Sequence, residues 1–213
     1  MRMISKLLAA TILAASTTAA SASDDSHYVV VGHFSQDTGA IPRLTRMAPR
    51  IFDDMMQNGM KFGDQVTFIG TQAAPDAWIA DFTLSAKAGR ARPEHLADFL
   101  NQRLADFATV DAPADGSELW WTLDQITNQT VCASRATHIY IITNGFSASE
   151  ETADGQIYGA GVFPSSLEGC HVTMVGLASY APSGTSLNQR RSLEHMFELA
   201  ITRGGAASYG VLN

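Results

Sequence analysis

Apolar positions along the chain form short runs that alternate with longer stripes of helical spacing. The first run is the β-branched segment 28–31, which precedes a turn-rich stretch and then apolar residues at three- and four-residue steps over 41–60. Short apolar runs predict buried strands, and stripes at this spacing predict amphipathic helices. The same pattern predicts further strands at 65–70, 77–84, 138–143, 172–177 and 206–212, and further helices at 93–107, 117–129 and 186–202.

Local signals mark several boundaries of these elements. Pro42 lies near the first turn of the first helix, where its missing N–H costs nothing. Ser186 and Gln189 have the spacing of a capping box at the start of the last helix, and a glycine pair at 204–205 follows the expected end of that helix. The stretch 144–169 is rich in glycine and serine, and we interpret it as a connecting region.

The alternation of strands and helices predicts an α/β fold. Most strands are separated by helices and should therefore run parallel, in a sheet that is covered on both faces. The strands at 65–70 and 77–84 are joined by a short loop, which forces an antiparallel pair. We therefore expect a doubly wound, mostly parallel six-stranded sheet with one antiparallel edge strand, and a ligand site at the carboxyl ends of the strands.

The first 22 residues have the features of a cleavable export signal. Arg2 and Lys6 precede a short apolar run over 7–15, and the small residues at 20–22 provide a cleavage site after Ala22. The alternative, a membrane anchor, needs about 20 apolar residues, and this stretch is shorter. We therefore expect a signal peptide at 1–22, one soluble domain at 23–213, and a location in the periplasm or outside the cell.

The predicted mature chain is acidic. Two of the 14 basic residues lie in the signal, so 12 basic and 21 acidic residues remain, with a formal charge of −9. An acidic domain without a Lys/Arg cluster is a poor ligand for nucleic acid or for an anionic membrane surface. No later segment is long and apolar enough to span a membrane. The composition therefore argues against nucleic acid as a partner and against a membrane-spanning mature chain.

The chain has two cysteines, Cys132 and Cys170. An even number of cysteines in an exported chain is read first as a disulfide. Two unpaired thiols are one alternative. A metal site that includes His138 and His171 is another, although the spacing matches no standard zinc pattern.

Three local patterns, together with the order of elements, resemble the von Willebrand factor type A domain. The segment 115–119 at a helix start resembles the Gly-Gly-Thr loop of that family, and 141–145 resembles its strand ending in Thr-Asp-Gly. The segment 199–209 resembles its closing pattern, a helix ending in Thr-Gly-Gly before an aromatic residue in the last strand. The resemblance spans nearly the whole predicted mature chain and implies the same doubly wound fold.

Many members of that family hold a divalent cation, and here the corresponding ligands are altered. The family motif Asp-x-Ser-x-Ser corresponds to 33–37, so His33 replaces the leading Asp, Ser35 is kept, and Asp37 replaces the last Ser. Ser117 replaces a Thr, and Asn144 replaces the final Asp. Mg²⁺ requires oxygen ligands with carboxylate charge, whereas imidazole suits transition ions. The resemblance therefore implies a degenerate site without a resident cofactor, and the alternatives are a weak or altered cation site and a site rescued by Asp37 or Glu118.

The resemblance also implies roles for residues at both ends of the sheet. The strand order of the family would make 138–143 and 172–177 neighbours, so that a bridge between Cys132 and Cys170 would lie at their amino ends. Trp120 lies near the loops at the carboxyl ends, as an interface anchor or as a half-buried core residue.

Ser35, flanked by His33 and Asp37, is the nearest approach to a hydrolase nucleophile, but the chain has no Gly-x-Ser-x-Gly elbow.

These observations favour a binding domain over an enzyme. We expect the protein to bind another protein or an envelope component through the loops at the carboxyl ends of the strands. The alternative is a metal-dependent ligand binder or a hydrolase centred on His33, Ser35 and Asp37. The expected binding surface consists of His33, Ser35, Asp37, Ser117, Glu118, Trp120 and Asn144.

Overall fold

The computed structural model covers the sheet and the two helices that pack on it. It describes residues 25–33, 46–70, 79–83, 102, 119–120, 123–124, 127, 132, 134–146, 149–151, 157–159, 166–179 and 184–213. The strands of the main sheet are β1 (His27–Gly32), β2 (Gln65–Gly70), β3 (Ile79–Thr83), β4 (Thr137–Ile142), β7 (Cys170–Val175) and β8 (Ser208–Leu212). The helices are α2 (Ala48–Gln57) and α5 (Leu187–Arg203), and a separate two-stranded sheet consists of β5 (Ser149–Glu151) and β6 (Ile157–Gly159).

Five strands of the main sheet run parallel to one another. The strand order is β3-β2-β1-β4-β7-β8, and β1, the first strand in sequence, lies between β2 and β4. β7 pairs with β4, and β8 pairs with β7, both in the parallel sense. β3 pairs with β2 in the antiparallel sense. The prediction of an α/β fold built on a parallel sheet is confirmed.

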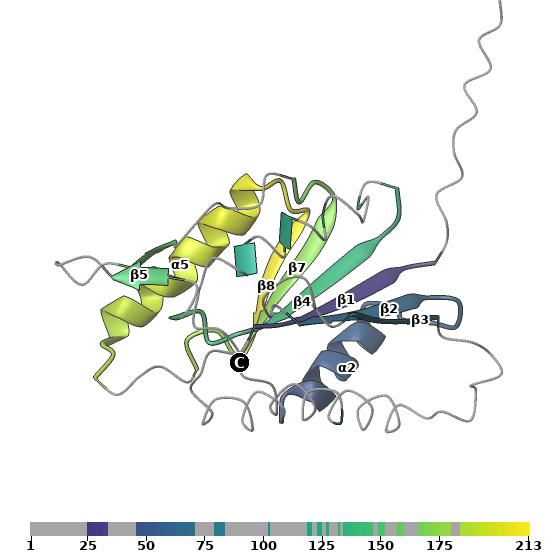
Figure 1. Cartoon of the computed structure of the whole chain (residues 1–213), viewed down its shortest axis with the longest axis horizontal. Helices are drawn as coiled ribbons and strands as arrows, with labels where there is room; N and C mark the ends of the chain where they lie inside the picture. Colours follow the sequence, from purple (N-terminus) through teal and green to yellow (C-terminus); the bar gives the residue numbers. More distant parts are fainter. Residues whose placement is uncertain are drawn as a thin grey trace, which may run out of the picture.

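The two faces of the sheet are covered by different helices, as Figure 1 shows. Successive side chains of a strand point to opposite faces, so Val29 and Val31 of β1 face the helix α5, whereas Tyr28 and Val30 face α2. α5 contributes the buried residues Leu193, Met196, Phe197, Ala200 and Ile201 to the first face. α2 contributes Ala48, Ile51, Phe52 and Met55 to the second face.

Residues at the ends of α2 and α5 account for where these helices begin and end. The side chain of Ser186 accepts a hydrogen bond from the backbone N–H of Gln189, and the side chain of Gln189 accepts one from the N–H of Ser186, so the predicted capping box is present. α5 ends at Arg203 and is followed by Gly204. α2 begins at Ala48, with Pro49 in its first turn. The predicted start of this helix near Pro42 lies outside the described residues.

One prediction about the connecting regions was incomplete. The stretch 144–169 contains β5 and β6, which pair antiparallel, and β6 lies against α5. Strands of three residues are too short to give an alternating pattern that can be recognised in the sequence. The predicted helix at 93–107 lies almost wholly outside the described residues. Within the described part of the chain, no helix is long and apolar enough to cross a membrane.

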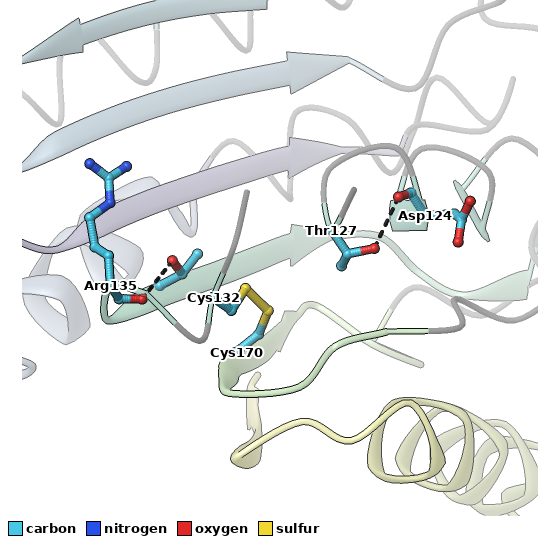
Figure 2. The surroundings of a disulfide bond; sticks show 6 residues. Asp124, Thr127, Cys132, Arg135 and Cys170 are labelled. Carbon is cyan, nitrogen blue, oxygen red and sulfur yellow. Dashed lines mark hydrogen bonds between the residues drawn. A yellow bond between two sulfur atoms is a disulfide. The ribbon is translucent and has the colours of Figure 1, made fainter. Parts of the chain in front are cut away.

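A disulfide joins Cys132, which precedes β4, to Cys170, the first residue of β7 (Figure 2). The two Cα atoms are 5.1 Å apart, and the two cysteines are separated by 38 positions in sequence. Both side chains are buried in the cluster that α5 covers. The bridge therefore joins the segment before β4 to the start of β7 at the amino ends of neighbouring strands, the place that the resemblance implied for it. Closing a loop of this size stabilises the fold by about 4 kcal/mol in the chain-entropy description.

Candidate functional site

The candidate site lies at the carboxyl ends of β1 and β4. β2, which follows β1 in sequence, pairs on one side of β1, and β4 pairs on its other side. The strand order therefore reverses between β1 and β4. In open α/β sheets such a switch point leaves a crevice where ligands bind. His33 follows β1, and Thr143 and Asn144 follow β4. The topology therefore brings together two segments that the sequence analysis had assigned to the site.

His33 is fixed in the interior at this edge. Its side chain is buried, and its Nδ1 lies 3.0 Å from Oγ1 of Thr143. Its backbone N–H donates to the carbonyl oxygen of Ile142 at 2.9 Å, which extends the pairing of β1 with β4 by one residue. Burial lowers the pKa of His33 from 6.5 to about 4 because the charged imidazolium loses its hydration. The imidazole is therefore neutral at physiological pH.

The loop after β4 is held by its own polar side chains. The hydroxyl oxygen of Thr143 accepts a hydrogen bond from the backbone N–H of Gly145 at 3.0 Å, in addition to its contact with His33. The side-chain oxygen of Asn144 accepts one from the backbone N–H of Phe146 at 3.1 Å. These are local turns in which a short side chain replaces a backbone partner. The side-chain oxygen of Asn144 is therefore already engaged inside the protein.

The loops after β4 and β7 are tied to each other. The backbone N–H of Ala178 donates to the carbonyl oxygen of Asn144 at 3.1 Å, and Ala178 has a positive φ of 58°. Gly145 has a φ of +84°, and a Cβ atom at this position would lie 2.6 Å from Leu177 and 2.9 Å from Phe197. Only glycine fits without displacing these core side chains. The candidate site therefore has a rigid floor built from the two loops.

The residues predicted for the binding surface have different positions. His33 and Asn144 lie at the switch point as expected, and both are buried, with 5% of their surface exposed. Trp120 is completely buried and stacks on Phe197 of α5 with ring centroids 5.0 Å apart. Its predicted role as an exposed anchor is therefore corrected to the core alternative. The remaining candidates, Ser35, Asp37, Ser117 and Glu118, lie outside the described residues.

Thr143 is the residue whose importance the sequence analysis underestimated. It appeared there only as part of the resemblance to a Thr-Asp-Gly loop. In the structure it is fully buried and connects the ends of β1 and β4 through His33. A threonine followed by Asn-Gly at the end of a buried strand is a usable signal for such a turn, but the identity of its partner depends on the strand order.

A second polar cluster lies between α2 and the sheet. The hydroxyl of Tyr140 donates to the carboxylate of Asp54 at 2.8 Å, and the side chain of Asn58 donates to the same oxygen at 2.9 Å. Burial, together with the contact to Asp54, raises the pKa of Tyr140 above its ordinary value. The tyrosine therefore stays protonated and serves as a donor that anchors α2.

Metal ligands do not converge among the described residues. In that part of the chain, no three His, Cys, Asp or Glu side chains are grouped closely enough to hold an ion. The Nδ1 atom of His33 contacts Thr143, and the cysteines are joined to each other, so these donors are engaged. Comparison with known proteins adds no assignment: no protein-family model matches the chain, and no curated protein shows a significant sequence match.

Proposed function

We propose that this chain is an exported von Willebrand A-like domain that binds a protein or an envelope component through the loops at the carboxyl ends of its strands. The proposal includes the finer fold assignment, a six-stranded sheet with β3 as its antiparallel edge. It also includes cleavage of the signal after Ala22 and the absence of catalysis. The single observation that carries it is the position of His33 and Asn144 on either side of the switch point between β1 and β4.

The rigidity of this edge supports a binding role. A surface that is already ordered loses less conformational entropy when a partner docks on it. The hydrogen bonds of Thr143 and the packing of Gly145 provide this order beneath the loops. Because His33 is buried and neutral, and Asn144 replaces a carboxylate, the two positions lack the negative charge that a hard cation requires. These features support contact with a macromolecule over coordination of a hard cation.

In-cell crosslinking tests the binding proposal. A photo-crosslinking residue at position 35 or 37, positions that follow β1 in sequence, should capture an envelope partner. Asp37→Ala and Ser35→Arg should reduce that capture at least severalfold, because they change the proposed binding surface without removing a described core contact. Ser134→Ala, at an exposed position near the opposite end of β4, is the matched control and should leave capture unchanged. Equal capture by all four proteins would refute the proposed surface.

Export and metal dependence are tested separately. The mature protein from the envelope fraction should begin at Ser23, which N-terminal sequencing will determine. Elemental analysis of the purified protein, followed by titration with Mg²⁺, Mn²⁺ and Zn²⁺, should detect no stoichiometric ion. An ion that binds stoichiometrically and is lost in Asp37→Ala would replace the proposal with the metal-dependent alternative.

A further inference from the structure

Three aromatic rings are stacked across the amino ends of the strands, on the face that α2 covers. Tyr28, His138 and His171 occupy one row of the register of β1, β4 and β7, and we call them the ring column. The centroids of Tyr28 and His138 are 5.0 Å apart, and those of His138 and His171 are 4.8 Å apart. Ser208 continues the row on β8, with its Oγ 2.9 Å from Nδ1 of His171.

The ring column lies in a mixed electrostatic environment. Burial lowers the pKa of His138, and the neighbouring His171 lowers it further, whereas the carboxylates of Asp54 and Asp64 raise it. Asp54 receives hydrogen bonds from Tyr140 and Asn58. The carboxylate of Asp64 accepts backbone hydrogen bonds from Ser26 and Lys61 at 2.7 Å each. These carboxylates stabilise a single positive charge on the ring column. Two imidazolium rings at stacking distance, in contrast, repel each other directly.

The geometry favours proton binding over metal binding. The two imidazole planes differ by only 17°, so their nitrogen lone pairs lie in nearly parallel planes and do not converge on one ion. Both side chains are half-buried, which leaves a route for protons from solvent. The adjacent row of the register pairs Thr137 with Cys170, so the disulfide lies one row away from the histidine pair, on the opposite face of the sheet, which α5 covers.

We propose that His138 and His171 form an acid-responsive element: the neutral rings hold β4 and β7 together at their amino ends, and the second proton separates them. The Cys132 to Cys170 bridge keeps the two strands tethered while this edge loosens, so that the change is local and reversible. The inference concerns the end of the sheet opposite to the proposed binding loops and is independent of the partner.

Hydrogen exchange at pH 7.5 and pH 5 tests this element. After correction for intrinsic exchange, the amides at the amino ends of β4 and β7 should lose about tenfold in protection on acidification, relative to amides at the carboxyl ends of the same strands. His138→Phe keeps a stacked ring without a charge and should suppress most of this loss. His171→Phe should do the same and serves as the second variant if the first fails to fold.

His195→Gln is the matched control, because His195 lies on α5 with 67% of its side chain exposed. This helix packs on the face of the sheet opposite to the ring column. This variant should keep the full acid-dependent loss of protection. In parallel, NMR contacts between the ring protons of His138 and His171 in the wild-type protein should weaken at pH 5 together with the amide protection. The proposal would be overturned if the wild-type protein kept its protection at pH 5. It would also be overturned if both Phe variants lost as much protection as the wild-type protein.

Discussion

The two ends of the parallel sheet are stabilised in different ways. At the carboxyl end, His33 and the loop after β4 are joined by hydrogen bonds of 3.0 Å between buried residues. At the amino end, a disulfide joins the segment before β4 to β7, and the half-buried rings of His138 and His171 stack across the two strands. The first end depends on local geometry that tolerates little change. The second end depends on a covalent tether and on stacked rings.

This difference separates a rigid surface from an adjustable one. Buried hydrogen bonds to neutral groups give a unique arrangement, because an unsatisfied partner would cost the full desolvation penalty. Stacked histidines give an arrangement whose energy depends on pH. Under the proposed function, rigidity is an advantage at the end that carries the binding loops, and adjustment can be accommodated at the other end.

The largest expected effect concerns the disulfide at the amino end. The double variant Cys132→Ser/Cys170→Ser should lose about 4 kcal/mol of unfolding free energy, because the unfolded chain regains the entropy of a closed loop. Thermal unfolding should show a melting temperature lower by roughly 10 °C. Reduction of the wild-type protein should produce a similar shift, and a negligible shift in both experiments would show that the bridge does not constrain the fold.

The next effect concerns the charge of His33 at the carboxyl end. Its folded pKa lies below its unfolded value, so its contribution to stability is complete above about pH 6.5 and is lost as the pH falls toward 4. The full loss is about 3 kcal/mol. His33→Asn, which does not titrate, should show a correspondingly flatter dependence of unfolding free energy on pH between 7 and 4. Parallel curves for the two proteins would contradict the neutral, buried state of His33.

A smaller effect should distinguish two glycines with similar backbone angles. Gly145→Ala adds a methyl group that meets Leu177 and Phe197, and we expect a loss of about 2–4 kcal/mol. Gly59 follows α2, has a φ of +87° and has no atom within 4 Å of an added Cβ. Gly59→Ala should therefore cost only about 1 kcal/mol, the backbone penalty alone. Equal losses in denaturant unfolding would argue against tight packing beneath the candidate site.

The smallest effect concerns the hydroxyl of Thr143. Thr143→Val removes the contact with Nδ1 of His33 and the acceptor for the N–H of Gly145, and should cost about 1–3 kcal/mol. Thr173→Val is the control, because Thr173 lies half-buried within β7, away from this loop. Chemical denaturation measures the loss of unfolding free energy in the two variants. Equal losses would show that the turn after β4 does not depend on the hydroxyl of Thr143.

Part of the candidate site was readable from the sequence because its signals are local. His33 follows a β-branched run after one glycine, and Asn144 precedes a glycine at the end of another apolar run. The contact between His33 and Thr143 was not readable, since it joins residues 110 positions apart in the chain. Trp120 shows the same limit: the sequence left open whether it is an interface anchor or a core residue, and stacking on Phe197 of a distant helix places it in the core.

The sequence by itself determined the α/β class, the capping box of α5 and the pairing expected for the two cysteines. These follow from periodicity, from contacts within one helical turn and from an even cysteine count. Tertiary structure alone decided that His33 is neutral, that Gly145 admits no side chain and that His138 stacks on His171. Each of these properties arises where segments distant in sequence meet at a shared register, and burial there changes the energy of a charge or a methyl group.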